Sequence, residues 1–325
     1  DISLSSDTEL AISKSMGLGM IGFSDAFNEL QPDLLVVLGD RFEIFSAVSV
    51  AMIAKIPVAH LHGGEATEGL IDEPIRHSIT KMSHLHFTAT NEYRNRVIQL
   101  GEQPDRVFNV GGLGIDNINK LKLLTKSDFE KAIDFELGEK NLLVTFHPVT
   151  LENSTSETQF QELLDSISEL KNTKIIFTKA NSDTDGRIIN SMIDAYVAKH
   201  DNTIAFVSMG QLNYLSALQF MDAVVGNSSS GLLEAPSFKI ATIDIGDRQK
   251  GRIKADSVIS CLPSKDSIGK AFNELYSKQF QSAVGKVENP YGKDGASEEI
   301  VRIIKDISLD GIVKKSFYDF KGFSQ

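Results

Sequence analysis

Short apolar runs that alternate with helical stretches are the feature that most limits what this chain can fold into. From residue 33 onward, the runs are bounded by glycine, proline or aspartate. They are separated by segments of about ten to fifteen residues with helical spacing, which is typical of a parallel α/β sheet. Because the runs are almost wholly apolar, we expect the strands to be buried on both faces, with helices above and below.

The pattern predicts the following elements. The expected strands are 34–38, 58–61, 84–89, 107–110, 142–146, 175–178, 204–207, 223–225 and 241–245. The expected helices are 42–55, 72–82, 92–100, 160–170, 185–199 and 211–221, with a charged helical stretch over 121–137 and a helical tail over 297–320.

The chain is long for a single hydrophobic core. It has 325 residues, whereas single cores stop growing near about 250–300 residues. The rhythm of strands weakens between 117 and 140, so we expect one α/β domain over 1–125, a second over 126–300 and a helical tail over 301–325. The first expected strand follows a polar amphipathic segment, which predicts that a further piece of the first domain precedes Asp1.

Composition excludes several classes of protein. With 41% apolar and 24% charged residues, the chain is a globular protein rather than a disordered or fibrous one. Its single cysteine, Cys261, cannot form an internal disulfide or a thiolate metal cage. A net charge of −11 argues against a general nucleic-acid or membrane binder. Without a membrane-spanning or signal-like stretch, we expect a cytoplasmic protein.

Acidic and basic residues follow the first two expected strands, where ligand sites of open α/β sheets lie. Asp40 and Arg41 are adjacent, so Asp40 can act on a substrate while Arg41 anchors a phosphate or a partner. Alternatively, Asp40 simply caps the helix that follows. His60 and His62 form a His-x-His pair, which also allows a metal site, although the nearby carboxylates lack firm ligand spacing.

We favour a cluster of acids and bases around one sugar ring over a metal site. It would comprise His62, Glu65 and Asp72, together with Asp40. Arg76 and His77 follow Asp72 at helical spacing and can neutralise or orient the carboxylates. The remaining histidines of this region, His84 and His86, and also His200, are interpreted as structural.

The second expected domain contains two candidate phosphate-binding loops. The first is a small-residue turn at a helix start, where Asn227 or Ser228 can cap and free N–H groups bind an anion; its residues are Asn227, Ser228, Ser229, Ser230 and Glu234. Glu234 would lie about two turns into the helix, near a ribose. The second loop places Arg248, Lys250 and Arg252 together. His147 follows the first strand of this domain. An ordinary capped turn, solvated loop charges and, for His147, a structural histidine at a strand end are the alternatives.

Seven segments of the sequence resemble the bacterial hydrolysing UDP-N-acetylglucosamine 2-epimerases of sialic- and legionaminic-acid biosynthesis. They run in order along the chain from about residue 30 to its end. The segments are GDRFEIFSA (39–47), HGGEATEGLIDEPIRHSITKMSHLHF (62–87), RVIQLGE (96–102), FNVGGLG (108–114), TFHPVT (145–150), GNSSSGLLEAPS (226–237) and IGDRQKGR (245–252).

The resemblance implies two Rossmann-like domains facing across a cleft, as in the glycosyltransferase-B fold. The first domain would be the sugar and catalytic side and lack its first strand here, the second would bind UDP, and the tail would pack back towards the first. It also implies a substrate that is a UDP-sugar. We expect no nucleic-acid or membrane partner, and a homodimer or homotetramer.

Carried over by motif, the resemblance assigns roles to individual residues. Asp40 and Asp72 match catalytic carboxylates. Related enzymes have glutamate where this chain has His62, so either His62 or Glu65 would take that role, and we favour Glu65 because Gly63 and Gly64 free the backbone. Ser228, Ser229 and Glu234 match positions that bind the diphosphate and ribose, while His147 and Arg248 match residues near the phosphates.

The same residues agree with a reaction that needs no metal ion and no nicotinamide. UDP would be eliminated across C1–C2 to give a glycal, and water would then add to release the C2 epimer. The substrate would be UDP-N-acetylglucosamine or its 2,4-diacetamido-2,4,6-trideoxy relative, UDP-N,N'-diacetylbacillosamine. A glycosyltransferase on the same scaffold and a non-catalytic UDP-sugar-binding protein are the alternatives.

Overall fold

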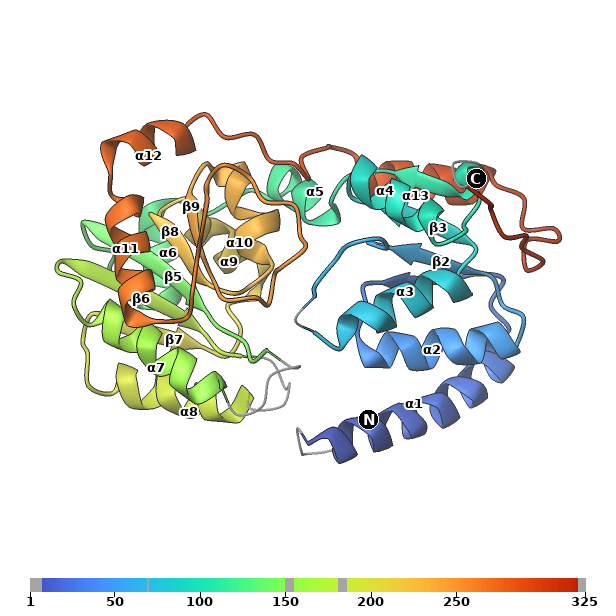
Figure 1. Ribbon diagram of the computed structural model, residues 1–325, viewed down its shortest axis with the longest axis horizontal. Coiled ribbons are helices and arrows are strands. Elements are labelled where there is room, and N and C mark those ends of the chain that lie inside the picture. The colour runs from blue at the N-terminus through green and yellow to red at the C-terminus, as the bar shows by residue number, and fades with distance from the viewer. Residues whose placement is uncertain (1–7, 69, 150–154, 181–185, 321–325) are drawn as a thin grey trace, which may run out of the picture. The chain divides into compact units, whose positions relative to one another are not determined.

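The computed structural model describes residues 8–68, 70–149, 155–180 and 186–320. The chain divides into two compact units (Figure 1). Unit 1 comprises residues 1–67, 71–116 and 293–325, and unit 2 comprises 68–70 and 117–292. Each unit contains one wholly parallel sheet. The structure thus confirms the prediction of two parallel α/β domains.

Unit 1 is built on a four-stranded sheet with the order β1-β2-β3-β4. Its strands are β1 (Leu35–Leu38), β2 (Val58–Leu61), β3 (Leu85–Thr88) and β4 (Val107–Asn109). Its helices are α1 (Glu9–Leu30), α2 (Phe42–Ile53), α3 (Asp72–Met82), α4 (Asn91–Gln99), η1 (Pro104–Arg106), the first turn of α5 (Leu113–Lys120) and α13 (Ala296–Asp306).

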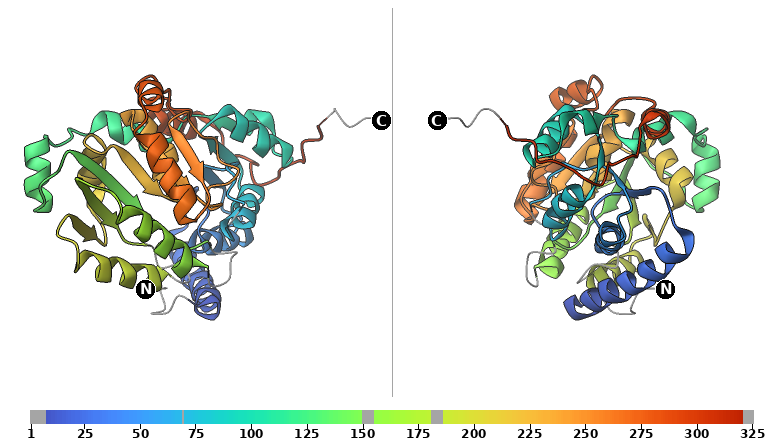
Figure 2. Two further views of the ribbon diagram at one scale, coloured as in Figure 1. Left: turned by 60° about the vertical axis from the view of Figure 1, so that its left-hand side comes forward. Right: turned by 90° about the vertical axis from the view of Figure 1, so that its right-hand side faces the viewer.

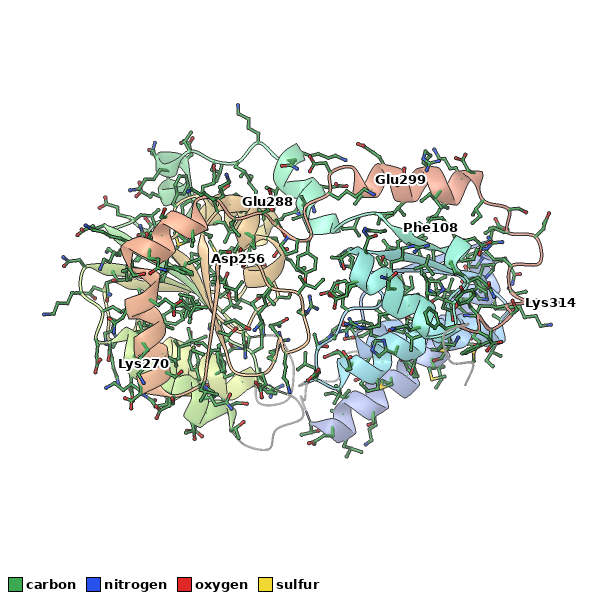
Figure 3. All side chains as sticks on the ribbon, turned by 45° about the horizontal axis from the view of Figure 1, so that its top comes forward. Phe108, Asp256, Lys270, Glu288, Glu299 and Lys314 are labelled. Atoms are coloured by element: carbon green, nitrogen blue, oxygen red, sulfur yellow. The ribbon has the colours of Figure 1, made fainter. Side chains whose placement is uncertain are left out.

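Helices cover both faces of this sheet. Val37 and Val58 pack against α2 and α3 on one face, whereas Leu61 and Phe87 pack against α13 on the other (Figures 1 and 2). Phe87 also stacks with Phe108 of β4, which is labelled in Figure 3, at 5.6 Å between ring centroids. The two apolar clusters hold the strand ends of unit 1 in a fixed register.

Strand β1 corrects one expectation from the sequence. Although its residues are all apolar, β1 lies at the edge of the sheet, and Val36 and Leu38 are 49% and 53% exposed. The prediction of burial on both faces is therefore wrong for this strand. Continuous apolarity does not distinguish a central strand from an edge strand.

Unit 2 is built on a six-stranded sheet with the order β10-β9-β8-β5-β6-β7. Its strands are β5 (Lys140–Thr145), β6 (Thr173–Thr178), β7 (Thr203–Phe206), β8 (Ala223–Gly226), β9 (Ala241–Ile245) and β10 (Val258–Cys261). Its helices are α6 (Lys126–Ile133), α7 (Ser156–Ile167), α8 (Gly186–Val197), α9 (Gly210–Leu218), α10 (Ser230–Leu233), η2 (Ala235–Phe238), α11 (Lys265–Leu275) and α12 (Lys278–Val284).

Alternate residues of the central strands pack on opposite sides of this sheet. Leu142 and Val144 of β5 contact the cluster of α7, α8 and α11, while Leu143 contacts the cluster of α6 and α9. Strand β10 was not predicted, because it is a short edge strand that contains the exposed Ser260. The buried strands, by contrast, lie where the apolar runs predicted them.

The crossings between the units lie earlier than the predicted boundaries at 125 and 300. The chain leaves unit 1 after Asp116 and returns at Lys293. The first turn of α5 belongs to unit 1 because Asp116 is hydrogen-bonded to the start of α13. Helix α13 belongs there too, because Ile300 and Ile303 pack on the sheet.

Two predicted helices are shorter in the structure. Within 121–137 only α6 is helical; Thr125 caps its start and Asp134 adopts a left-handed conformation at its end. In the tail, the helix ends at Asp306, and the prediction of helix to residue 320 is wrong. Gly311 lies in a turn, and its φ of 69° is a value that an α-helix does not allow.

None of the described helices combines the length and the apolar character that crossing a membrane requires.

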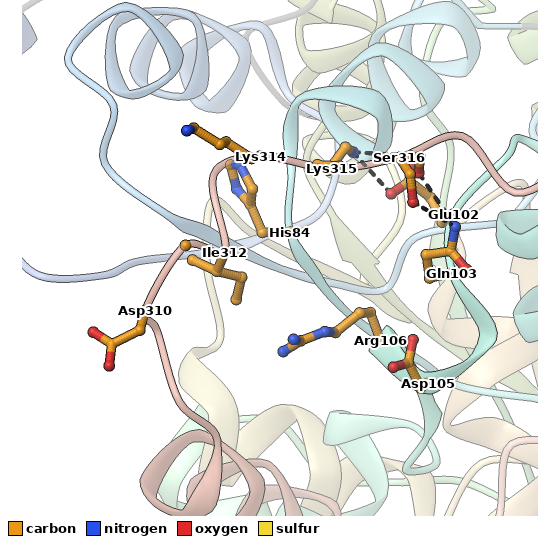
Figure 4. A pocket seen from close by; sticks show the side chains of 11 residues that line it. His84, Glu102, Gln103, Asp105, Arg106, Asp310, Ile312, Lys314, Lys315 and Ser316 are labelled. Carbon is orange, nitrogen blue, oxygen red and sulfur yellow. Dashed lines mark hydrogen bonds and ion pairs between the residues drawn. The ribbon is translucent and has the colours of Figure 1, made fainter.

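Buried Glu102 is the centre of a charge network at the end of unit 1 where β3 and β4 begin, and Figure 4 shows its contacts with Lys315. It accepts hydrogen bonds from Nε2 of His86 at 3.0 Å and from Nζ of Lys81 at 2.6 Å and of Lys315 at 2.8 Å. Burial alone would raise the pKa of Glu102, but the hydrogen bonds from His86, Lys315 and Lys81 lower it from 4.5 to about 2.

This network predicts acid-sensitive stability. Because the folded-state pKa of Glu102 is depressed, its contribution is present above pH 4.5 and is lost as the pH falls towards about 2. The shift corresponds to about 3 kcal/mol of unfolding free energy. Denaturant titrations between pH 6 and 2.5 should show this loss, and it should shrink in Glu102→Gln. Glu288→Gln, at an exposed carboxylate labelled in Figure 3, controls for the loss of charge. An unchanged pH dependence in Glu102→Gln would contradict the assignment.

Candidate active site

The ends of β1 and β2 bring Asp40 and His62 to the same edge of the unit 1 sheet. Leu38 pairs with Leu61 in the parallel register, so the residues that follow both strands lie side by side. Asp40 does not cap α2: Arg41 occupies the N-cap position, and the Asp40 carboxylate instead accepts a hydrogen bond from Nη2 of Arg76. The alternative in which Asp40 only caps the helix is therefore wrong. Arg41 lies at the surface, 3.5 Å from the carboxylate of Glu43.

Arg76 is the buried centre of this cluster, with only 1% of its surface exposed. Its Nη2 donates to Asp40 and, at 2.8 Å, to Oγ1 of Thr67. Its Nη1 donates to Oε2 of Glu73 at 2.6 Å and to the carbonyl oxygen of Glu65 at 3.0 Å. All four terminal N–H groups therefore bond to the protein, so Arg76 positions the carboxylates around it.

Glu73 is a member of the cluster to which the sequence analysis gave no role. It accepts hydrogen bonds from the Thr67 N–H at 2.6 Å and from Nε2 of His77 at 3.1 Å, besides that from Arg76. Burial alone would raise its pKa, but the hydrogen bonds from His77 and Thr67 and the charge of Arg76 lower it to about 2. Its spacing of three and four residues from Arg76 and His77 was the signal in the sequence.

His62 and Glu65 form a hydrogen-bonded pair. Nδ1 of His62 lies 2.8 Å from Oε1 of Glu65, and the Leu113 N–H donates to Nε2 of His62 at 3.3 Å. Nε2 must carry a lone pair to accept that bond, so the proton is on Nδ1, which donates to the Glu65 carboxylate. The two residues that could replace the glutamate of related enzymes, His62 and Glu65, are therefore bonded to each other.

The two glycines between them serve close packing. Gly64 has a φ of 79°, and a Cβ on it would lie 2.3 Å from the carbonyl oxygen of Tyr93. The Glu65 side chain is buried and bonded to His62. Gly64 therefore fixes this loop against α4 and Gly63 packs closely on His60, so the loop is not free.

Two further residues of unit 1, Asp72 and His60, were considered for the site. Asp72 is the first residue of α3, one turn before Arg76, and is partly exposed. Buried His60 lies 2.8 Å from the carbonyl oxygen of Gly39 through Nε2, and burial lowers its pKa to about 3. His60 thus supports the strand end that carries Asp40.

The histidines interpreted as structural have structural partners. His84 accepts from the Val58 N–H, His86 bonds to Glu102, and His200 stacks on Tyr196, which confirms that interpretation. No group of metal-ligating side chains in the described ranges could hold a metal ion.

In unit 2, three neighbouring strand ends meet at Asn227. Strands β5, β8 and β9 pair so that Thr145, Gly226 and Asp244 are adjacent. The buried side chain of Asn227 accepts from the His147 N–H at 2.7 Å and donates to the His147 carbonyl oxygen at 2.8 Å. Asn227 therefore joins the loops after β5 and β8.

The loop after β9 is tied to the same residue. Nη1 of Arg248 donates to the Asn227 carbonyl oxygen at 3.1 Å, and Nε2 of Gln249 donates to it at 2.9 Å. The sequence analysis missed Gln249, whose partner is distant in the chain. Exposed Lys250 pairs with Glu68 at 3.0 Å. The two predicted phosphate-binding loops thus form one surface around Asn227.

The helix start after β8 differs from the prediction. Ser229, not Asn227 or Ser228, is the N-cap of α10, and its side chain makes no capping hydrogen bond. Helix α10 has only four residues, so Glu234 is its C-cap rather than a residue two turns in. Ser230 accepts a hydrogen bond from the Tyr214 hydroxyl at 2.6 Å. An anion here would depend more on Arg248 and backbone N–H groups than on a helix dipole.

The fold and the sequence of this chain were compared with those of known proteins. A solved structure of UDP-GlcNAc 2-epimerase from Neisseria meningitidis, bound to UDP-GlcNAc, matches with a TM-score of 0.80 at 20% identity, covering 94% of this chain and 84% of that one. The fold is therefore that of the two-domain, glycosyltransferase-B-like 2-epimerases.

The sequence comparison is more specific. The family model described as UDP-N-acetylglucosamine 2-epimerase matches residues 1–305. A GDP/UDP-N,N'-diacetylbacillosamine 2-epimerase (hydrolyzing) of Campylobacter jejuni is 42% identical over 98% of this chain and 83% of its own length. The polysialic acid biosynthesis protein P7 of Escherichia coli is 42% identical over 99% and 81%. The chain belongs to the UDP-N-acetylglucosamine 2-epimerase family, which confirms the resemblance found in the sequence.

Proposed function

We infer that the chain is a hydrolysing UDP-sugar 2-epimerase. It acts on a UDP-linked 2-acetamido sugar, releases UDP and yields the free sugar with inverted configuration at C2. The observation that carries this function is the cluster in which Arg76 holds Asp40 and Glu73, next to the His62–Glu65 pair. Family membership and the hydrolysing relative of Campylobacter jejuni support it.

The chemistry requires several proton-transfer groups. No carbonyl acidifies the proton on C2, so a base removes it while the C1–O bond breaks and UDP leaves with the electron pair. The glycal then gains a proton at C2 on the opposite face and a water-derived hydroxyl at C1. Each step is a proton transfer or a C–O bond change, so this route uses neither a metal ion nor a nicotinamide.

Residues of unit 1 supply these groups in the proposal. Asp40 and Asp72 act as acid and base on C2 and on water. Arg76 and Glu73 hold Asp40 and His77 in position through the contacts described above. Because His62 and Glu65 share one hydrogen bond, they act as a pair in which one member transfers the proton and the other orients it.

Residues of unit 2 bind the nucleotide in the proposal. Arg248 donates to the diphosphate, with Ser228, Ser229 and Ser230 contributing hydroxyl and N–H groups. Glu234 accepts from the ribose hydroxyls. The side chains of Asn227 and Gln249 hold the loops of this surface together through their bonds to His147 and to the Asn227 carbonyl oxygen.

The finer biological assignments are proposals as well. We propose a cytoplasmic enzyme that assembles as a homodimer or homotetramer, which sedimentation analysis would determine. The product would enter sialic- or legionaminic-acid biosynthesis, in keeping with the name of the Escherichia coli relative.

Product analysis tests the function. The protein is incubated separately with UDP-N-acetylglucosamine and UDP-N,N'-diacetylbacillosamine, in buffer with and without EDTA. We expect equimolar UDP and a free C2-inverted sugar from one or both, unaffected by EDTA. Sugar transfer that occurs only with an acceptor, or binding without turnover, would contradict it.

Arg248 is expected to dominate the affinity for UDP. Arg248→Glu replaces a charge-assisted phosphate contact with repulsion, so the dissociation constant measured by calorimetry should rise at least about tenfold. Lys270→Glu, at an exposed residue of α11 (Figure 3), changes net charge equally and should have little effect. An unchanged affinity in Arg248→Glu would remove this residue from the site.

His62→Gln and Glu65→Gln should separate the proton-transfer member of the pair from the orienting one. The transferring residue should lose about a hundredfold or more in turnover, and the orienting residue less. The measurement is kcat at saturating substrate, with the midpoint of denaturant unfolding as the control for folding. Full activity in both variants would exclude the pair from the chemistry.

A further inference from the structure

Asp116 links the start of α5 to the start of α13. It lies three residues after Leu113, is only 3% exposed, and accepts hydrogen bonds from two consecutive backbone N–H groups, of Ala296 at 3.0 Å and of Ser297 at 2.7 Å. The Gly295 N–H, at 2.9 Å, and the Ser297 hydroxyl donate to it as well. One carboxylate from α5 thus caps the first turn of α13.

These contacts join the two places where the chain crosses between its units. The chain leaves unit 1 directly after Asp116 and re-enters it at Lys293. Nζ of Lys293 also donates to the Asn109 carbonyl oxygen at 2.8 Å. A Cβ on Gly111 would lie 2.6 Å from Cβ of Lys293, so the two segments pack in direct contact. The exit and the return of the chain are therefore held together within unit 1.

Helix α13 is in turn anchored to the sheet. Ala296, Ile300 and Ile303 belong to the same buried cluster as Leu61 and Phe87. Because α13 is packed in this way, a residue that is hydrogen-bonded to its first turn is held in a fixed position. Through its hydrogen bonds to α13, Asp116 also fixes the position of the first turn of α5.

The first turn of α5 also sets the protonation pattern of His62. The Leu113 N–H donates to Nε2 of His62, so the ring proton must lie on Nδ1, where it reaches Glu65. With the opposite tautomer, Nε2–H would face the Leu113 N–H, and the lone pair of Nδ1 would face a carboxylate oxygen. The Leu113 N–H and the Glu65 carboxylate therefore favour the same tautomer of His62, and the Leu113 N–H contributes to that preference only while the first turn of α5 stays in place.

We propose that Asp116 is a positioning residue that holds the first turn of α5 on α13, and thereby keeps His62 in the Nδ1–H form that donates to Glu65. This role rests on the proposed function, because it concerns the proton-transfer pair of that reaction. Asp116 touches neither His62 nor Glu65 in any contact described above; it acts through the position of Leu113.

Nitrogen NMR of the imidazole rings tests this role without any turnover. Protein labelled with ¹⁵N-histidine should show His62, assigned by the signal lost in His62→Gln, with Nδ1 protonated and Nε2 unprotonated. In Asp116→Ala the signals should shift towards a mixture of the two tautomers. Ser297→Ala, which removes one of the four bonds, should have a smaller effect. Asp306→Ala, at the exposed far end of α13, is the matched control and should have none.

Kinetics provide the second readout. Asp116→Ala should lose about tenfold or more in kcat, the scale of a misplaced catalytic group, with KM changed by less than about twofold. If that variant does not fold, Asp116→Asn, which keeps one acceptor oxygen, replaces it in both measurements. A folded variant with the wild-type His62 tautomer overturns the proposal, even if its activity falls. An inactive wild-type protein with the expected tautomer shift would instead count against the proposed function alone.

Discussion

Arg76→Ala is expected to destabilise the protein by about 3 kcal/mol and to lower turnover at least about a hundredfold. Removing one partner of a buried ion pair leaves the other charge uncompensated, a change that costs about 3–5 kcal/mol when all groups are buried. The loss of unfolding free energy in Arg76→Ala should lie at the lower end of this range, because the side chains of Asp40 and Glu73 are 21% and 24% exposed. Denaturant titration measures the stability, and product release measures the turnover.

Arg302→Ala is the matched control for this variant. Arg302 also contacts two carboxylates, those of Glu299 and Asp306, but its side chain is 60% exposed. Exposed pairs contribute little, so the unfolding free energy of Arg302→Ala should change far less than that of Arg76→Ala. Equal stability losses in the two variants would show that burial of Arg76 does not matter, and normal turnover in Arg76→Ala would remove the cluster from the chemistry.

Asp40→Asn and Asp72→Asn are expected to lose at least about a hundredfold in kcat while still binding UDP. The amide keeps the size of the side chain but cannot accept a proton as a base, and acid–base catalysis contributes about 10²–10⁴-fold. UDP affinity should persist, because the proposed nucleotide surface around Asn227 belongs to unit 2.

The two variants should differ in stability. Asp40→Asn weakens a contact of buried Arg76 and should lower the unfolding free energy, whereas Asp72, at the first position of α3, is more tolerant. Near-normal turnover in either variant would make that residue structural.

Local patterns predicted most of the fold because its buried strands are marked by local apolar runs. Strands β5, β8 and β9 lie inside their sheet and are buried along almost their whole length. The pattern of apolar runs gave wrong or missing predictions for the edge strands, which are only partly buried. It could not identify β1 as an exposed edge, and it missed β10, where Ser260 interrupts the run.

The candidate site was predictable to the extent that its residues are marked by their position. Asp40 and His62 lie within two residues of a strand end, and Arg76 lies one turn after Asp72, so their proximity could be inferred from the sequence. The roles of Asn227 and Gln249 could not, because their partners lie in other loops. Asp116 was missed for the same reason: its partners lie about 180 residues away along the chain.

The most direct test of the account is the reaction carried out in D₂O with the wild-type protein. Elimination removes the C2 proton, and hydration returns one from solvent on the opposite face, so the account predicts a free C2-inverted sugar with one deuterium at C2 and release of UDP. NMR of the product measures both the configuration and the label. A C2-inverted product that retains its original hydrogen at C2, or UDP released with a sugar of unchanged configuration, would contradict the proposed chemistry.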